Sequence, residues 1–358
     1  MYTKVKELIM TQTLFSHWQQ PNNDWLQIHT LEMHTGGEPL RIIVDGFEQL
    51  TGDTMLEKRA DCLARFDYLR KALMFEPRGH ADMYGAVITC AVRSDSHFGV
   101  LFLHNEGYST MCGHAIIALA TAAKDCALVD FKDGYNELRI DTPAGLIKAY
   151  VELNNNQLQQ VYFDNVASFV DKLDVKISLP MCGSVSCDIA FGGAYYAFVD
   201  ADTLNLSLAP DNHGHIISLG KAIKQQVTNQ YQPTHPTDQA LGFLYGVIFY
   251  SNSQLSQINH FSRHVCVFAE GELDRSPTGT GVSARAALAF AKGELAVGQS
   301  VNIESILGSA FNVMVKQTCE VKARSAIIPR VTGTAFVTGK HTFLIDPTDP
   351  LKQGFIFR

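Results

Sequence analysis

The sequence predicts an α+β protein built from two pseudo-symmetric α/β halves. Its 358 residues are enough for two domains, each with a hydrophobic core. One order of elements occurs twice along the chain: strands, a helix, strands, a glycine-bearing helix start and further strands. The two helix starts are similar to each other, because residues 111–120 align with residues 277–286 and place Cys112 opposite Thr278. We therefore expect one structural unit to be repeated.

The first half becomes rich in strands from Trp25, and residues 40–44 are apolar and β-branched, as in a buried strand. Thr54 and Glu57 form a capping-box pattern, which predicts that a helix begins there. The helix should end before residues 77–79, which are Pro-Arg-Gly. Its apolar face repeats at steps of four, three and four residues, through Cys62, Phe66, Leu69 and Leu73.

The next elements lead to the first glycine-bearing helix. Residues 86–92 and 98–104 are predicted strands, and Thr110 is the candidate N-cap of an Ala-rich helix that starts near Cys112. Residues 146–153 and 158–163 are strand-like and are separated by the asparagines 154–156, a pattern that predicts a β-hairpin.

The second half repeats this order after an irregular stretch. Residues 166–188 show weak periodicity, and we expect the chain to cross between the halves there. Residues 189–199 are strand-like with Gly192 and Gly193 inside the strand. A helix follows, with Leu219, Ala222, Ile223 and Val227 on one face. The remaining predicted strands are residues 244–250, 265–268, 313–321, 334–338 and 342–344.

These patterns divide the chain into an N-terminal extension and two domains. Residues 1–25 form the extension, and residues 26–188 form the first α/β domain with the Cys112 helix start. Residues 189–344 form the second α/β domain with the Thr278 helix start, and the tail 345–358 is expected to return to the first domain.

Composition excludes several classes of partner. The net charge is −7 and lysines and arginines are not clustered, which argues against nucleic acid and membrane surfaces. The longest apolar run, residues 115–123, is too short to span a bilayer, and the N-terminus lacks a signal-peptide pattern. Eight scattered cysteines without a C-x-x-C pair indicate reduced thiols and a cytoplasmic protein.

The helix starts are the strongest candidate site. The first turn of a helix presents unpaired N–H groups and partial positive charge, and it binds carboxylates. Gly113 and Gly279 directly follow Cys112 and Thr278, and glycine lets a ligand approach the backbone. The same environment is expected to lower the pKa of the Cys112 thiol from about 8.5. Alternatively, such helix starts are packing features and Cys112 is a small core residue.

Other candidates are weaker. The spacing of His104, Cys112 and His114 matches none of the common zinc patterns, so we expect no metal. A P-loop and a Gly-x-Gly-x-x-Gly motif after a strand are both missing from the sequence, so no nucleotide cofactor is expected. His34, His80 and Asp82 lie in glycine-flanked loops, where such residues more often shape turns than bind ligands or transfer protons. We therefore do not include them in the predicted site.

Several segments resemble the landmarks of the proline racemase family. The resemblance covers roughly residues 31–357 and implies the diaminopimelate epimerase-like fold, with the site in the cleft between two similar halves. The segments that carry it are residues 34–39, 76–80, 111–114, 141–145, 188–193, 274–281 and 333–336.

The sequence departs from the racemase pattern at Thr278. Racemases and hydroxyproline epimerases of this family carry cysteine in both motifs, and the two thiols work on opposite faces of the α-carbon. A threonine hydroxyl is too weak an acid and base for that exchange. The Cys112–Thr278 pattern resembles the trans-3-hydroxy-L-proline dehydratases of the family. This resemblance implies a cofactor-independent hydro-lyase of amino-acid degradation that forms Δ1-pyrroline-2-carboxylate.

The stereochemistry of this substrate explains how one thiol could suffice. The α-hydrogen and the 3-hydroxyl lie on one ring face, opposite the carboxylate. Cys112 can therefore take the proton and pass it to the departing hydroxide, while Thr278 binds substrate or fills space. These two residues are the expected catalytic residues. The expected substrate-binding residues are Gly113, His114, Asp274, Gly279 and Thr280.

Their roles differ. Backbone N–H groups at both helix starts are expected to bind the carboxylate and stabilise the developing charge. By resemblance, Asp274 binds the ring ammonium; an ordinary turn carboxylate is the alternative. The His114 side chain orients the substrate, or only its backbone matters. Two rival functions stay open, a racemase or 4-hydroxyproline epimerase and a non-catalytic amino-acid-binding protein. A small imino acid is the expected partner, and a homodimer is one open assembly state.

Overall fold

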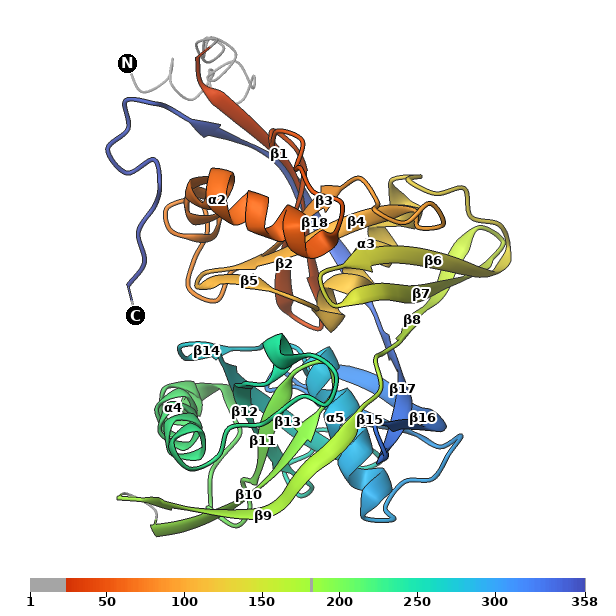
Figure 1. Ribbon diagram of the computed structural model, residues 1–358, viewed down its shortest axis with the longest axis vertical. Helices are drawn as coiled ribbons and strands as arrows, with labels where there is room; N and C mark the ends of the chain where they lie inside the picture. Colours follow the sequence, from red (N-terminus) through yellow and green to blue (C-terminus); the bar gives the residue numbers. More distant parts are fainter. Residues whose placement is uncertain (1–23, 181–182, 358) are drawn as a thin grey trace, which may run out of the picture.

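Two lobes stack along the long axis of the molecule (Figure 1). The structure is a computed structural model that describes residues 24–180 and 183–357. Residues 1–23 of the predicted N-terminal extension lie outside the described residues. Within residues 24–180 and 183–357, no helix has the length and apolar character needed to cross a membrane.

The upper lobe contains the first run of elements. Helix α2 covers one side of its sheet, and α3 packs on the other side. The elements are β1 (Leu26–Thr35), β2 (Glu38–Asp45), α2 (Met55–Met74), β3 (Tyr84–Thr89), β4 (Phe98–His104), β5 (Gly107–Ser109), α3 (Gly113–Asp125), β6 (Gly134–Thr142), β7 (Gly145–Asn154) and β8 (Gln157–Asp164).

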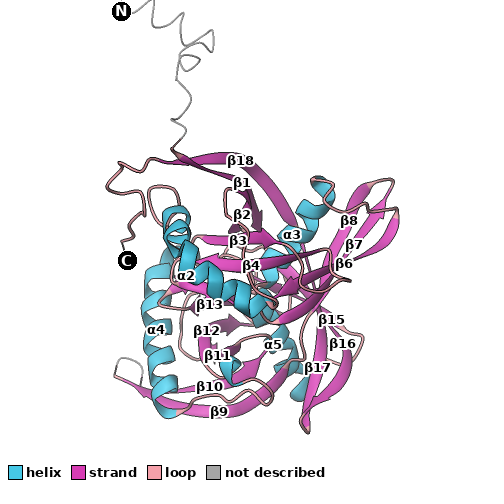
Figure 2. Cartoon of the chain, turned by 45° about the horizontal axis from the view of Figure 1, so that its top comes forward, coloured by secondary structure: helices cyan, strands magenta, loops and turns pink. Residues whose placement is uncertain are grey.

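The lower lobe contains the second run, with α4 in the place of α2 and α5 in the place of α3 (Figures 1 and 2). Its elements, with the last strand of the chain, are β9 (Phe169–Leu179), β10 (Gly183–Phe191), β11 (Tyr195–Asp200), η1 (Pro210–Asn212), α4 (His213–Gln230), η2 (Gln239–Leu241), β12 (Leu244–Ser251), β13 (Ser262–Phe268), β14 (Glu272–Leu273), α5 (Gly279–Ala291), β15 (Ser300–Glu304), β16 (Ala310–Val321), β17 (Arg324–Gly333) and β18 (Ala335–Ile345).

Strand pairing shows the repeat directly. The parallel pair β2–β3 corresponds to β11–β12, and the parallel pair β4–β6 corresponds to β13–β15. Hairpins β6–β7–β8 and β15–β16–β17 then follow in both lobes. Equivalent buried carboxylates even stand at equivalent places, Asp141 beside β4 and Glu304 beside β13. The predicted α+β fold with two similar halves is confirmed.

Each repeat ends with a strand that crosses to the other lobe. After β8 the chain enters β9, which pairs with β10, and after β17 it enters β18, which pairs with β1. Strands β8 and β17 pair with each other at the crossing. Consequently the sequence boundary at 188/189 falls inside β10. The tail touches the upper lobe through a bridge between Phe355 and Glu76. The division into domains stays a prediction.

Helices α3 and α5 lie inside the lobes. Their first eleven residues, Gly113–Ala123 and Gly279–Ala289, are all buried. The small alanine side chains let strands pack closely against every side of each helix. A helix that is apolar all round can therefore be buried completely. Because both helices are 13 residues long and begin after Cys112 and Thr278, the alignment of the two starts is confirmed.

Several local predictions are also confirmed. Thr54 caps α2 through a capping box with Glu57, and the predicted apolar face of α2 is buried. The asparagine-linked hairpin is β7–β8, with Asn155 and Asn156 at positive φ. The predicted apolar residues of α4 also face its lobe's core.

Four local predictions are wrong. Cys112, not Thr110, is the N-cap residue of α3. Residues 166–188 are not irregular, because they hold β9 and much of β10, although the chain does pass between the lobes at their start (Figure 1). Their strand pattern is obscured by the left-handed Asp174 and by register shifts near Cys187. The two C-terminal strands are one continuous β18, which tolerates a bulge opposite β1.

The fourth error concerns the glycine pair. The predicted strand 189–199 is two strands joined by a turn at Gly192-Gly193. A Cβ on Gly192 would lie 2.2 Å from the carbonyl oxygen of Thr280, and Gly193 has φ +108°. These glycines therefore allow the start of α5 to pack against the turn.

Candidate active site

The starts of α3 and α5 meet glycine to glycine between the lobes. A Cβ built on Gly279 would lie 2.8 Å from the Cα of Gly113, and the reverse substitution gives the same distance. No side chain larger than hydrogen fits this contact. Two helix N-termini, with their unpaired N–H groups, consequently converge on one place.

A pocket opens at this meeting point. All seven residues predicted for the site line it together. Its full lining is Tyr84, Met111, Cys112, Gly113, His114, Tyr196, Tyr245, Phe268, Asp274, Thr278, Gly279 and Thr280. A larger cleft of about 590 Å³ shares Met111, Tyr196, Tyr245 and Thr280 with the pocket.

Cys112 lies at the start of α3 with little exposure to solvent. Its Sγ is 3.2 Å from Nδ1 of His114, and Tyr84 lines the same pocket. Burial raises the pKa of the Cys112 thiol, and the negative charges of Asp274 and Glu38 raise it further. The backbone N–H of Ala115 and the Tyr84 hydroxyl oppose this rise. The predicted lowering of the thiol pKa is therefore wrong for the pocket as it stands, because desolvation outweighs the helix start.

His114 is a neutral imidazole. Burial lowers its pKa to about 4, against the opposing effects of Asp274 and of a hydrogen bond to the Pro39 carbonyl. Its ring packs edge-on to Tyr84 at 4.9 Å, and its carbonyl accepts a 2.9 Å hydrogen bond from Thr35. A thiolate–imidazolium pair is thus not the resting state near neutral pH.

Asp274 and Thr278 form one hydrogen-bonded turn before α5. Oδ1 of Asp274 accepts from the Ser276 N–H at 2.7 Å, and Oδ2 accepts from the Thr278 hydroxyl at 2.8 Å. Thr278 has φ +67°, a left-handed conformation that is strained for a β-branched residue. In this conformation the Thr278 hydroxyl points to Asp274 and does not cap the N–H groups at the start of α5.

The Thr280 hydroxyl is held from the opposite side. It lies 2.7 Å from the Tyr196 hydroxyl, which is itself buried on β11. Burial raises the pKa of Tyr196, so this phenol stays neutral.

Four aromatic residues of the lining were missed by sequence reasoning: Tyr84, Tyr196, Tyr245 and Phe268. Only Tyr84 carried a signal, because it follows the family-like segment 76–80 by four residues. The others come from β11, β12 and β13, whose places beside α5 depend on the strand order.

Glu38 is a further buried carboxyl next to the pocket. Its Oε2 accepts a 2.7 Å hydrogen bond from the Arg275 N–H, whereas Oε1 has no hydrogen-bond partner among the described residues. Burial, followed by the charge of Asp274, raises the pKa of Glu38 well above its ordinary value. The Arg275 guanidinium also reaches Asp82 at 2.8 Å, so this cluster joins the two lobes.

We expect Glu38→Gln to stabilise the protein at alkaline pH. The folded state holds the Glu38 proton more tightly than the unfolded state, so wild-type stability falls as pH rises above about 4.5 toward the folded pKa. A neutral amide removes this loss. Thermal unfolding should show a gain of about 1–3 kcal/mol at pH 8 and none at pH 4. An equal gain at both pH values, or one shared by exposed Glu320→Gln, would contradict this explanation.

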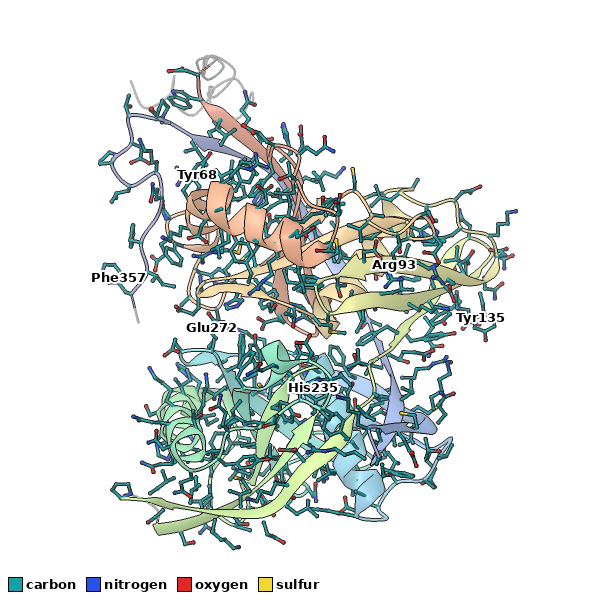
Figure 3. All side chains as sticks on the ribbon, in the orientation of Figure 1. Tyr68, Arg93, Tyr135, His235, Glu272 and Phe357 are labelled. Atoms are coloured by element: carbon teal, nitrogen blue, oxygen red, sulfur yellow. The ribbon has the colours of Figure 1, made fainter. Side chains whose placement is uncertain are left out.

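Other contacts also cross the cleft. Figure 3 shows Glu272 at the edge of the lower lobe that faces the upper lobe, where its carboxylate is 3.6 Å from His104 Nδ1. The Ser309 hydroxyl donates to the Gly36 carbonyl at 2.6 Å. The residues set aside in the sequence lie outside the pocket lining, with His80 exposed and His34 accepting from the Gly37 N–H. Within residues 24–180 and 183–357, no three His, Cys, Asp or Glu side chains gather as metal ligands.

Comparison with known proteins agrees with the two motifs at the helix starts. The family model described as proline racemase matches residues 30–356. The chain belongs to the proline racemase family. The predicted membership is confirmed.

Curated members of the family include close relatives of this chain. A protein of Colwellia psychrerythraea named trans-3-hydroxy-L-proline dehydratase is 48% identical over 355 residues, covering 99% of each chain. One of Bacillus cereus with the same name is 42% identical, covering 91% of this chain and 97% of its own. Among solved structures, a hydroxyproline epimerase from Agrobacterium vitis with bound trans-4-hydroxy-L-proline has a TM-score of 0.85 at 29% identity. That match covers 93% of this chain and 96% of the epimerase.

Proposed function

We propose that this family member is a cofactor-independent trans-3-hydroxy-L-proline dehydratase that forms Δ1-pyrroline-2-carboxylate. The observation that carries the proposal is one pocket with a thiol at one helix start and a threonine hydroxyl at the other. The names of the Colwellia and Bacillus relatives support the same substrate and reaction. A reduced thiol suits a cytoplasmic enzyme. A homodimer stays a prediction, which sedimentation would check.

Substrate binding follows from the charges in the pocket. The converging N–H groups at Gly113 and Gly279 receive the carboxylate. Asp274 receives the ring ammonium, because its carboxylate lines the pocket and is held in place by the turn before α5. This cation offsets the Asp274 charge, which otherwise raises the pKa of the Cys112 thiol. Substrate thus favours the thiolate that it needs.

The chemical step then uses one face of the ring. The Cys112 thiolate takes the α-proton, and the electron pair left on the α-carbon is stabilised through the carboxylate by the helix starts. This pair forms the new double bond as the C3–O bond breaks, and the hydroxide leaves as water. The proton of that water is balanced by the α-proton, which Cys112 takes and then gives up. The enamine tautomerises to the pyrroline. The opposite face needs no acid, which fits a threonine at position 278.

Incubation with trans-3-hydroxy-L-proline tests the proposal. Appearance of Δ1-pyrroline-2-carboxylate, followed by mass spectrometry, is the expected result. Deuterium at the α-carbon of L-proline together with D-proline, without dehydration, would instead indicate a racemase. Thermal stabilisation by the imino acid without product or exchange would indicate a binding protein.

Thr278→Val is expected to retain dehydratase activity. Valine keeps the β-branched shape but removes the hydroxyl that donates to Asp274. Losing this one hydrogen bond should lower kcat/KM by about tenfold or less, since about 1.4 kcal/mol corresponds to tenfold. Steady-state kinetics check this. A loss as complete as that expected of Cys112→Ser would mean that the hydroxyl takes part in proton transfer.

A further inference from the structure

We propose that Tyr84 protonates the departing 3-hydroxyl and so selects substrates with a hydroxyl on the Cys112 face of the ring. This inference deepens the proposed function and rests on it. Tyr84 starts β3, is only 4% exposed and lines the pocket. The sequence assigned no role to its phenol.

A line of hydroxyl groups leads to the catalytic sulfur. The Tyr84 hydroxyl hydrogen-bonds the Ser109 hydroxyl and lies near enough to Sγ of Cys112 to lower the pKa of that thiol. Ser109 lies on β5, directly before the loop that leads into α3. The phenol oxygen therefore lies on the thiol side of the pocket, where the 3-hydroxyl of a bound substrate also lies.

Packing fixes the ring of Tyr84. Its plane stacks on His104 with ring centres 5.8 Å apart, and His114 meets it edge-on at 4.9 Å. A ring held on two sides keeps the hydroxyl at one place beside the sulfur. Burial raises the pKa of Tyr84, so the group stays a phenol and has a proton to donate.

The proton balance closes with these two residues. Cys112 thiolate removes the α-proton and becomes a thiol. As the C3–O bond breaks, Tyr84 gives its proton to the departing oxygen, which leaves as water. The thiol proton passes to the Tyr84 oxygen, which lines the same pocket as the sulfur. Both residues then return to their starting states, and no other reactant is consumed.

The leaving group supplies a selective test. Fluoride departs without needing a proton, because hydrogen fluoride is a much stronger acid than water. We expect Tyr84→Phe to slow water loss from trans-3-hydroxy-L-proline by about 10²-fold. Elimination of fluoride from trans-3-fluoro-L-proline should slow by less than about tenfold, because this substrate loses only the lowering of the Cys112 pKa by the Tyr84 hydroxyl. Both reactions give the same pyrroline, so one assay measures both, with fluoride release as a second readout.

Control variants separate this role from a structural one. Cys112→Ser should abolish both eliminations, and Tyr150→Phe on β7 should change neither. Ser109→Ala should produce a smaller loss confined to the hydroxyl substrate. Equal slowing of both substrates by Tyr84→Phe, or no slowing of either, would overturn the role of Tyr84. A wild-type protein that dehydrates nothing would overturn the proposed function itself.

Discussion

Replacing Cys112 with serine is expected to lower dehydratase turnover by at least about 10³-fold. General acid–base catalysis contributes about 10²–10⁴-fold, and a serine hydroxyl has a pKa too far from the working pH to replace a thiol. Thr278, at the position equivalent to Cys112, offers no second thiol, and its hydroxyl donates to Asp274. His114 lies 3.2 Å from the sulfur, but burial lowers its pKa to about 4. It is therefore too weak a base to deprotonate a serine hydroxyl at this position.

Binding should survive the same substitution. Serine is smaller than cysteine, and the carboxylate and ammonium contacts that we propose come from backbone N–H groups and Asp274. We expect the substrate to raise the Tm of Cys112→Ser as it does for the wild type. Cys126→Ser is a matched control, since Cys126 is an exposed thiol at the other end of α3. Turnover within tenfold of wild type would remove Cys112 from the chemistry.

The sequence predicts the architecture well because each half of the repeat shows the same local sequence patterns. Caps, periodic apolar faces and asparagine turns are local, and Thr54 of α2 behaves as expected. The exchanged strands β9 and β18 could not be predicted, since their partners lie far along the chain. Chain order alone placed residues 166–188 with the first domain, whereas hydrogen bonds join β9 to β10.

The candidate site divides in the same way. Residues of the two helix starts were found because their chemistry and spacing repeat in the sequence. Tyr84 reaches the site at the start of β3 and Glu38 at the start of β2, so their places beside the pocket depend on three-dimensional packing. The direction of the Cys112 pKa was predicted wrongly for a related reason. The helix start is visible in sequence, but the burial that outweighs it is a property of the closed lobes.

Gly279→Ala is the second substitution with a large expected effect. The added methyl would lie 2.8 Å from the Cα and 3.3 Å from the carbonyl carbon of Gly113, both backbone atoms that cannot rotate away. Ordinary contacts of this kind begin at 3.4 Å, so the helix starts must separate by more than half an ångström. A displacement of about 1 Å in a site can cost about 10²-fold, and we expect kcat/KM to fall by about that factor.

Helix propensity provides the control for this prediction. Alanine in place of glycine within a helix stabilises it by about 0.5–1 kcal/mol when space allows. Gly214→Ala in the first turn of α4 meets nothing within 4 Å, so it should raise Tm slightly and leave kinetics unchanged. If Gly279→Ala behaved like Gly214→Ala, the two helix starts would not need close contact for catalysis.

The double variant shows whether one contact underlies both glycines. Gly113→Ala alone should resemble Gly279→Ala, because its methyl would lie 2.8 Å from the Cα of Gly279. Once one alanine has separated the helices, the second meets less resistance. We therefore expect the combined loss of kcat/KM to be smaller than the product of the single losses. If the combined loss of kcat/KM equalled the product of the single losses, each glycine would affect only its own helix. The proposal of one site shared by the two repeats would then lose its main support.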